Sequence, residues 1–246
     1  MKVENSIVLI TGASGGMGKE FVAELLRRGA AKIYLGVRDP QAVTSLLTLS
    51  DRLVPLTLDV TDPAQIEAAA QAAADVTLLI NNAGTAAFTG VLSAPDAAGA
   101  RQEMEVNYFG IINLAQAFRH TPAFRSGGAI VNILSILAHV TLPVAGSYSA
   151  SKAAALAMTR TLRAEVKPRG VQVLGVLPVQ TETAMGAALP EPKLKPAEVA
   201  RGTLDALEAG EEEVYPGALS QGAAQAFKAD PAGMQAQFAT MVHAIG

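Results

Sequence analysis

The chain has 246 residues, of which 50% are hydrophobic and 17% are charged, and its formal net charge is -3 at pH 7. This composition excludes a disordered chain, and the acidic balance lacks the basic surface of a nucleic-acid-binding protein. The absence of cysteine excludes disulfides, thiolate metal sites and cysteine nucleophiles. The histidines, His120, His139 and His243, do not have metal-ligand spacing, so we expect no metal site.

The apolar stretches of the chain are too short to cross a membrane. The longest, Ala129–Leu134 and Val171–Leu177, are far shorter than the roughly 20 residues of a spanning helix. The N-terminus has an apolar core that is too short and too rich in glycine for a signal peptide. We therefore expect a soluble, cytoplasmic protein with no membrane or nucleic-acid partner.

Apolar runs of strand length alternate with segments of helical length along the chain. The predicted strands are Ser6–Ile10, Lys32–Val37, Leu53–Leu58, Val76–Ile80, Ala129–Leu134, Val171–Leu177 and Glu213–Tyr215. The predicted helices are Gly16–Arg28, Pro63–Ala74, Asp96–His120, Ala145–Lys167 and Pro196–Ala209. The strands are almost continuously apolar, which is typical of sheets covered on both faces. This alternation predicts an α/β Rossmann fold, a doubly wound parallel seven-stranded sheet with helices on both faces.

The chain has no linker, repeat or low-complexity tract that would divide it. We therefore expect a single domain over residues 1–246. Thr183–Lys195, which is rich in alanine and proline, is predicted to form a surface loop near the substrate. The tail from Pro216 onward is predicted to form short helices at the edge of the sheet.

A glycine-rich turn, Thr11–Gly18, follows the first predicted strand and opens the first predicted helix. Glycines permit a tight turn and let backbone N–H groups approach a pyrophosphate at the positive end of the helix. Plain loops also collect glycine, but the position between strand and helix favours a nucleotide site.

The end of the second strand bears Arg38 and Asp39, where the adenosine ribose lies in a dinucleotide fold. An arginine would pair with a 2′-phosphate, whereas an acidic residue would bind the ribose hydroxyls. The structural alternative is an exposed ion pair of little energetic value. We favour the phosphate interpretation, and therefore NADP over NAD.

Tyr148 and Lys152 lie four residues apart near the start of a predicted helix, so their side chains share one face. An ammonium near the phenol lowers the pKa of a tyrosine and makes it a proton donor or acceptor. Taken alone, such a pair is usually an ordinary feature of a half-exposed helix. Ser135 and the segment Asn81–Gly84 end two strands at the same sheet edge. Asn107, a poor helix former, indicates a helix irregularity or a buried hydrogen bond.

These motifs occur together in one order: TGASGGMG, then NNAG, Asn107, Ser135 and YSASK. The combination resembles the short-chain dehydrogenase/reductase family from Ser6 to about Thr183. The resemblance implies that Tyr148 is the general acid/base and that Lys152 lowers its pKa and binds the nicotinamide ribose. It further implies that Ser135 holds the substrate oxygen and that Asn107 holds a water in a proton relay.

The resemblance also implies a set of cofactor-binding residues beside Tyr148 and Lys152. These are Gly12, Ser14, Gly16, Met17, Gly18, Arg38, Asp59, Val60, Asn81, Ala83, Gly84 and Thr183. Three positions depart from the family pattern. Val179 stands where a glycine is usual, Leu134 where a second serine is common, and Gly15 where many NADP-dependent members have a basic residue.

The resemblance therefore implies an NADP(H)-dependent oxidoreductase that reduces ketones or aldehydes, without a metal. The apolar residues of the loop Thr183–Lys195, which could close over the substrate, favour apolar ketones or aldehydes. One alternative is an NAD-dependent secondary alcohol dehydrogenase that uses Asp39. An alternative of another class is a non-catalytic NADP-binding regulatory protein. The resemblance also implies a homodimer or homotetramer, in which Asp96–His120 and Ala145–Lys167 pair across a two-fold axis.

Overall fold

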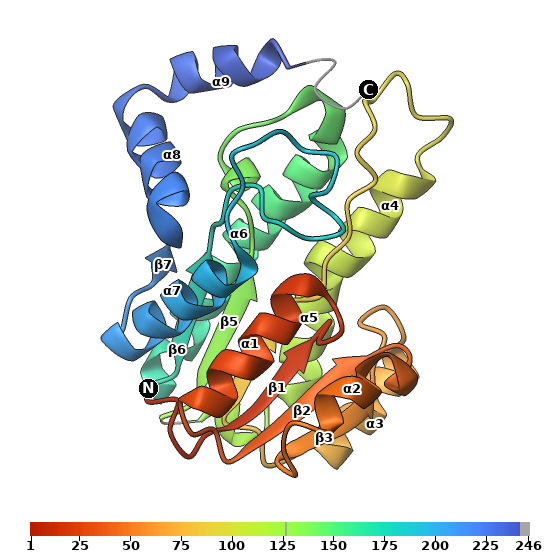
Figure 1. The fold of residues 1–246 in the computed structure, drawn as a ribbon, viewed down its shortest axis with the longest axis vertical. Coiled ribbons are helices and arrows are strands. Elements are labelled where there is room, and N and C mark those ends of the chain that lie inside the picture. Colours follow the sequence, from red (N-terminus) through yellow and green to blue (C-terminus); the bar gives the residue numbers. More distant parts are fainter. Residues whose placement is uncertain (126, 242–246) are drawn as a thin grey trace.

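The computed structural model describes residues 1–125 and 127–241, so His243 lies outside the described residues. The strands form one parallel sheet in the order β3-β2-β1-β4-β5-β6-β7 (Figure 1). In chain order they are β1 (Ile7–Thr11), β2 (Lys32–Val37), β3 (Leu53–Thr57), β4 (Leu78–Asn81), β5 (Ala129–Ile133), β6 (Gln172–Val176) and β7 (Glu213–Val214). The predicted fold class is confirmed, and each predicted strand lies within two residues of its observed bounds.

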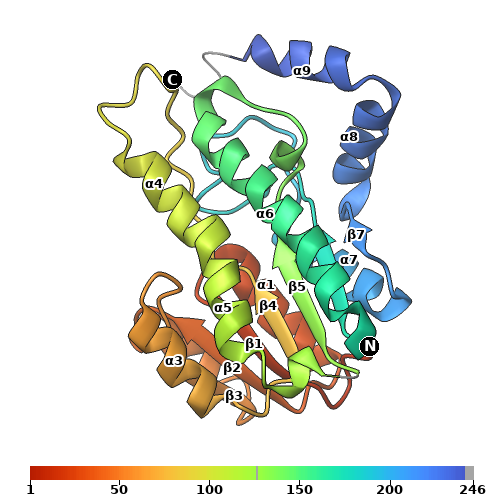
Figure 2. The same cartoon turned by 180° about the vertical axis from the view of Figure 1, so that it is seen from behind.

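Helices cover both faces of this sheet. They are α1 (Gly16–Arg27), α2 (Thr44–Leu47), α3 (Pro63–Ala72), α4 (Ala98–Met104), α5 (Gly110–Phe118), α6 (Gly146–Val166), α7 (Pro196–Ala209), α8 (Gly217–Ala229) and α9 (Pro231–Ala239). Helices α1 and α7 lie on the face seen in Figure 1, and α3, α4, α5 and α6 lie on the face seen in Figure 2. Helices α8 and α9 lie beyond β7 at the edge of the sheet.

The two hydrophobic cores follow from the alternation of side chains along each strand. In β1, Val8 and Ile10 point to the core under α1 and α7, where they belong to the same buried cluster as Phe21. Leu9, between them, points to the opposite core and clusters with Phe118 of α5. All of these side chains are buried, which explains why the strand sequence shows no polar alternation.

The helix ends follow local sequence signals. The Asp62 carboxylate caps α3 by accepting hydrogen bonds from the backbone N–H groups of Ala64 and Gln65, with Pro63 in the first turn. After α6, Gly170 adopts a φ of +66°, a left-handed conformation that favours glycine. These residues fix where α3 begins and where the chain turns from α6 toward β6.

The structure differs from prediction in the segment Asp96–His120, which is not one regular helix. A π-helical turn over Glu105–Phe109 separates α4 from α5, at the irregularity that Asn107 indicates. The short 3₁₀ turn Pro40–Val43 and the single turn of α2 were not predicted, because elements of four residues give no hydrophobic period. No helix of the described residues combines the length and apolar composition that crossing a membrane requires.

Candidate active site

A cleft of about 510 Å³ opens at the carboxyl ends of the strands, where the strand order reverses between β1 and β4. Ligands of doubly wound sheets bind at this reversal, because neighbouring connections leave the sheet toward opposite faces. The predicted cofactor residues that line the cleft are Gly12, Ser14, Gly16, Met17, Gly18, Arg38, Asp59, Val60, Ala83, Gly84 and Thr183.

The glycine-rich turn lines the cleft with backbone atoms that no side chain covers. Gly12 has a φ of +66°, and a Cβ on Gly18 would overlap the Gly12 carbonyl oxygen and the Ala13 backbone. The N-cap residue of α1, Gly15, makes no side-chain capping hydrogen bond, and the first turn of α1 has no acidic residue. The helix therefore presents uncapped N–H groups to the cleft, as a pyrophosphate requires.

Arg38 and Asp39 have different environments at the end of β2. Arg38 is exposed at the cleft, and no carboxylate in the described part of the chain lies within ion-pair distance of it. The Asp39 carboxylate turns away to cap the 3₁₀ turn Pro40–Val43, where it accepts a 2.9 Å hydrogen bond from Gln41 N–H. Asp39 does not line the cleft.

Asp59 and Val60 form the wall after β3. One carboxylate oxygen of Asp59 accepts hydrogen bonds from the Thr61 backbone N–H at 2.9 Å and the Thr61 hydroxyl at 2.7 Å. Val60 lies against Gly110, where an added Cβ would stand 3.0 Å from Val60 Cγ2. This end of the cleft is thus a fixed turn packed against α5.

The two adjacent asparagines at the end of β4 make different contacts. Asn81 does not line the cleft; it is buried beneath it, and its Nδ2 donates to Asn132 Oδ1 at 2.7 Å. Asn82 lines the cleft instead, and its Nδ2 donates to the Thr11 carbonyl at 2.9 Å and the Gly12 carbonyl at 3.2 Å. The structure therefore assigns Asn81 to the framework and Asn82 to the support of the glycine turn.

Asn107 is buried in the π-helical turn and joins three elements. Its Oδ1 accepts from Thr85 N–H at 2.9 Å, and its Nδ2 donates to the Thr85 carbonyl at 2.8 Å. The same Nδ2 donates to Ser151 Oγ at 2.9 Å, on helix α6. Asn107 therefore fixes the segment after β4 relative to the helix that bears Tyr148 and Lys152.

Tyr148, Ser135 and Lys152 meet beyond Gly84. Lys152 Nζ lies 5.6 Å from the centroid of the Tyr148 ring and donates to the Ile133 carbonyl at 2.9 Å. A Cβ on Gly84 would lie 3.3 Å from Asn107 Oδ1 and 3.6 Å from Lys152 Nζ, which places this group against the cleft wall.

Burial is the largest influence on the pKa of Tyr148, and its effect is opposite to the lowering predicted from Lys152. Burial raises the pKa of Tyr148 to about 12, while a hydrogen bond with the Ser135 hydroxyl opposes this rise and the nearby charge of Glu103 adds to it. Burial also lowers the pKa of Lys152 to about 8. Because burial disfavours the charged phenolate, the site holds a protonated phenol near neutral pH, next to the Lys152 ammonium.

Thr183 reaches the cleft although Val179 replaces the usual glycine. The Val179 side chain packs against two hydrophobic clusters, one of which contains Leu194 and the other Ile136, and its N–H donates to Ser220 Oγ at 3.2 Å. The base of the loop Thr183–Lys195 is held where Glu182 N–H donates to the Leu194 carbonyl at 2.8 Å. Leu134 is buried with Leu156 and plays no part in the cleft.

Some cleft residues escaped prediction because they belong to no motif. These are Leu58, Thr85, Gln102 and Val106. Gly36 and Val37, at the strand end predicted to lie at the ribose, and Ala184 and Met185, in the loop predicted to lie near the substrate, also line the cleft. The buried residue Glu103 was also not predicted as part of the site. His139 lies outside the site, where its Nε2 is 3.0 Å from the Tyr215 hydroxyl and its ring stacks on Phe227.

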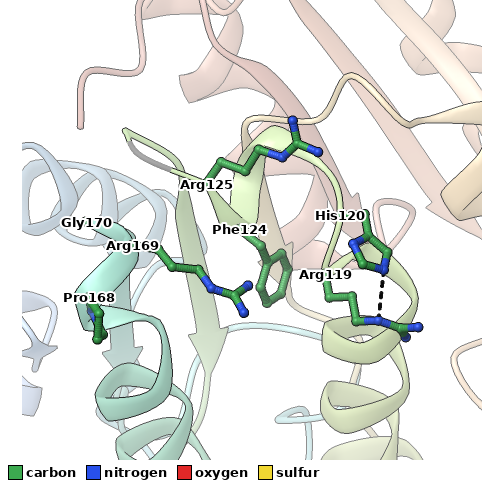
Figure 3. A pocket seen from close by; sticks show the side chains of 7 residues that line it. All are labelled: Arg119, His120, Phe124, Arg125, Pro168, Arg169 and Gly170. Atoms are coloured by element: carbon green, nitrogen blue, oxygen red, sulfur yellow. Dashed lines mark hydrogen bonds between the residues drawn. The ribbon is translucent and has the colours of Figure 1, made fainter.

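A second hollow, of about 800 Å³, lies at the opposite end of the sheet (Figure 3). Its lining residues are Arg119, His120, Phe124, Arg125, Pro168, Arg169 and Gly170. They precede β5 and β6, whereas Ser135 follows β5. Arg119 Nε donates a hydrogen bond to His120 Nε2 at 3.1 Å. Despite its size, this open cationic surface contains none of the acid–base residues and is not the active site.

Comparison with known proteins agrees with this geometry. Residues 6–194 match the family model for short chain dehydrogenases. The chain is 39% identical over 188 residues to the short-chain dehydrogenase PC-15 of Penicillium crustosum, which covers 74% of this chain and 68% of that protein.

Two solved structures extend the comparison. A short chain dehydrogenase from Burkholderia cenocepacia J2315 in complex with NADP is 44% identical, with a TM-score of 0.90 over 97% of this chain and 99% of that one. The NADPH-bound carbonyl reductase from chicken fatty liver is 28% identical, with a TM-score of 0.79 over 86% and 96%. With a family model that spans most of its sequence, the chain belongs to the short-chain dehydrogenase/reductase family of oxidoreductases.

Proposed function

We propose that this protein is an NADPH-dependent carbonyl reductase that acts on apolar ketones or aldehydes. The observation that supports this most is the position of Lys152 Nζ, which lies 5.6 Å from the Tyr148 ring centroid and next to Gly84 in the wall of the dinucleotide cleft. The phenol is protonated near neutral pH, as the proton donor in a reduction must be.

The cleft residues fit NADPH. The uncapped N–H groups at the start of α1 would bind the pyrophosphate, and Arg38 would pair with the 2′-phosphate. Gly84 and Lys152 would border the nicotinamide ribose, and Thr183 the nicotinamide amide. The NADP complex of the Burkholderia relative and the NADPH complex of the chicken reductase support this choice.

The bound cofactor supplies a hydride to the carbonyl carbon. The chain's own residues act on the oxygen. The Ser135 hydroxyl donates a hydrogen bond to the carbonyl oxygen, and the Tyr148 phenol transfers its proton to the same oxygen as negative charge develops there. The Lys152 ammonium stabilises the resulting tyrosinate until it is reprotonated. Asn107 holds Thr85 and Ser151 in place and so keeps Lys152 and Tyr148 in register.

The surroundings of Tyr148 favour an apolar substrate. Leu142 and Val144 form a buried cluster against which Phe88 and the Tyr148 ring pack. Met185 on the loop Thr183–Lys195 is 39% exposed and lines the cleft. A charged or sugar substrate would lose hydration against such side chains.

We further propose that the protein is a homo-oligomer in the cytoplasm. The outward face of α6 exposes Ala150, Ala153 and Ala157, and Phe109 beside α5 is 41% exposed. Small side chains allow close helix contact across a two-fold axis, and an exposed aromatic gains from being covered. Sedimentation at micromolar concentration is expected to show a dimer or tetramer; a single monomeric species would contradict this part.

The test is NADPH oxidation, followed at 340 nm, with a panel of aromatic and aliphatic ketones and aldehydes. Tyr148→Phe is expected to reduce turnover about 10²- to 10⁴-fold while NADPH still binds, because only the proton donor is removed. Full turnover in Tyr148→Phe would overturn the mechanism. Tight NADPH binding without turnover on any carbonyl would instead support a non-catalytic regulatory protein.

A further inference from the structure

Glu103 of α4 is a buried carboxylate next to the active site, and no motif includes it. The residue is 1% exposed. Its Oε1 accepts a hydrogen bond from Ala87 N–H at 2.7 Å, whereas its Oε2 is buried and has no partner among the described residues. A buried carboxylate with half of its hydrogen-bonding capacity unused is costly, and such a group calls for an explanation.

Glu103 extends the contacts that Asn107 makes. The two residues are four apart and lie on one face of the helix. Asn107 bonds both backbone groups of Thr85, and Glu103 bonds the N–H of Ala87. One helix face therefore holds alternate residues of the segment 84–88. Gly84 begins this segment in the cleft wall, and Phe88 ends it with its ring centroid 6.3 Å from that of Tyr148.

The charge of Glu103 also acts on Tyr148. Lys152, on the same helix, lies with its Nζ 5.6 Å from the centroid of the Tyr148 ring. The charge of Glu103, on α4, raises the pKa of Tyr148, and the Ser135 hydroxyl lowers it. Lys152 favours the tyrosinate and Glu103 favours the neutral phenol. The charge of Glu103 therefore adds to the larger effect of burial in keeping the proton on Tyr148.

We propose that Glu103 is a positioning residue: its Oε1 anchors, through Ala87 N–H, the segment 84–88 that carries Phe88 against Tyr148. From this buried position its charge has a second, separable effect on Tyr148. This inference rests on the proposed carbonyl reductase function, in which Tyr148 is the acid. It assigns to Glu103 a bias toward reduction over alcohol oxidation, because oxidation begins from the tyrosinate.

Two substitutions separate these effects. Glu103→Gln removes the charge but keeps an oxygen that accepts from Ala87 N–H. Glu103→Asp keeps the charge but draws it back from Ala87 by one methylene. Glu105→Gln is the matched control, since it removes the same charge from an exposed residue two positions away.

The first readout is the ionisation of Tyr148 itself, by NMR of protein labelled with ¹³Cζ-tyrosine. The chain has 4 tyrosines, so the Tyr148 signal is identified by its loss in Tyr148→Phe. We expect its titration to shift to lower pH by about half a unit in Glu103→Gln and to be unchanged in Glu105→Gln. In Glu103→Asp we expect a titration close to wild type, with the Kd for NADPH raised about fivefold by loss of one hydrogen bond.

The outcomes distinguish this inference from the proposed function. An unchanged Tyr148 titration in Glu103→Gln overturns the electrostatic effect, and unchanged NADPH affinity in Glu103→Asp overturns the anchoring effect. If both effects appear but the wild-type protein reduces no carbonyl, the proposed function fails while the assignment of Glu103 stands. If Glu103→Gln does not fold, the measurement on Glu103→Asp still tests the anchor. An NADPH affinity of Glu103→Asp that equals or exceeds that of the wild type overturns it.

Discussion

Gly16 and Thr183, 167 positions apart, face each other across the cleft: a Cβ on Gly16 would lie 3.1 Å from Thr183 Cγ2. We expect Gly16→Ala to push Thr183 outward by a few tenths of an ångström and to weaken NADPH binding about three- to tenfold. Stability is expected to change little, because alanine is the better helix former. Fluorescence titration with NADPH measures the affinity.

Gly15→Ala is the control for this substitution. It adds the same methyl group to the same turn, where the nearest contact is an ordinary 3.4 Å to the Gly12 carbonyl oxygen. Its affinity for NADPH is expected to match the wild type. Equal weakening in both variants would show that the turn itself, and not the approach of Thr183, controls binding.

Cofactor choice is expected to depend on Arg38 and not on Asp39. Arg38→Ala should weaken NADPH binding about 10- to 100-fold, the contribution of a charge-assisted contact, and leave NADH binding unchanged. Asp39→Asn keeps an oxygen for Gln41 N–H and removes the charge, so it should not change NADH affinity. A loss of NADH affinity in Asp39→Asn would favour the NAD-dependent alcohol dehydrogenase.

The two reaction directions are expected to respond oppositely to pH. Burial lowers the pKa of Lys152 to about 8, so its ammonium is present below pH 8 and is lost as the pH rises through that value. Burial raises the pKa of Tyr148 to about 12, so the phenol stays protonated and the tyrosinate increases about tenfold per pH unit.

We therefore expect kcat/KM for ketone reduction to be level near neutrality and to fall above pH 8, whereas alcohol oxidation rises. Steady-state rates in both directions between about pH 6 and pH 10 test this. Lys152→Met should remove the fall above pH 8, at a lower overall rate. Reduction that stays constant up to pH 10 in the wild type would contradict the assignment to Lys152.

His139 is expected to make the protein sensitive to mild acid. Burial lowers the pKa of its imidazole, an effect that Arg160 strengthens and Glu213 opposes. The native state therefore disfavours the protonated ring. Stability is full above the unfolded pKa of about 6.5 and declines as the pH falls below it.

The melting temperature of the wild type should fall between about pH 6.5 and pH 5. In His139→Phe, whose new ring can still stack on Phe227, the melting temperature should fall less steeply with decreasing pH. His120→Gln, a change at an exposed histidine after α5, should show the wild-type slope. Parallel slopes in all three proteins would assign the acid sensitivity to other groups.

The fold was predictable because its signals are local and repeated. Each strand is a short apolar run, and glycine or an aspartate–proline pair marks where helices begin or end. The irregularity at Asn107 was also predictable, since an asparagine inside an apolar helix needs a partner. The family motif then directs attention to the few residues that meet at one edge of the sheet.

The rest of the site depends on three-dimensional placement. Asn81 and Asn82 are identical in type and adjacent, and only the pleat of β4 decides that Asn81 faces Asn132 and Asn82 faces the glycine turn. Glu103 stands in a polar stretch that would suit an exposed helix surface, and its burial follows from the path of the segment 84–88. The pKa of Tyr148 depends on burial, which no spacing of residues expresses.

The strand order has a consequence for how the chain is made. The first strand, β1, pairs with β2 and also with β4, whose partner residues for Val8–Ile10 are Leu78–Ile80. At a synthesis rate of about 5 to 20 residues per second, β1 waits on the order of ten seconds for its second neighbour. During that interval one edge of a strand with four consecutive apolar residues, Ile7–Ile10, is unpaired. The nascent chain is thus most open to aggregation before its nucleotide site has been closed.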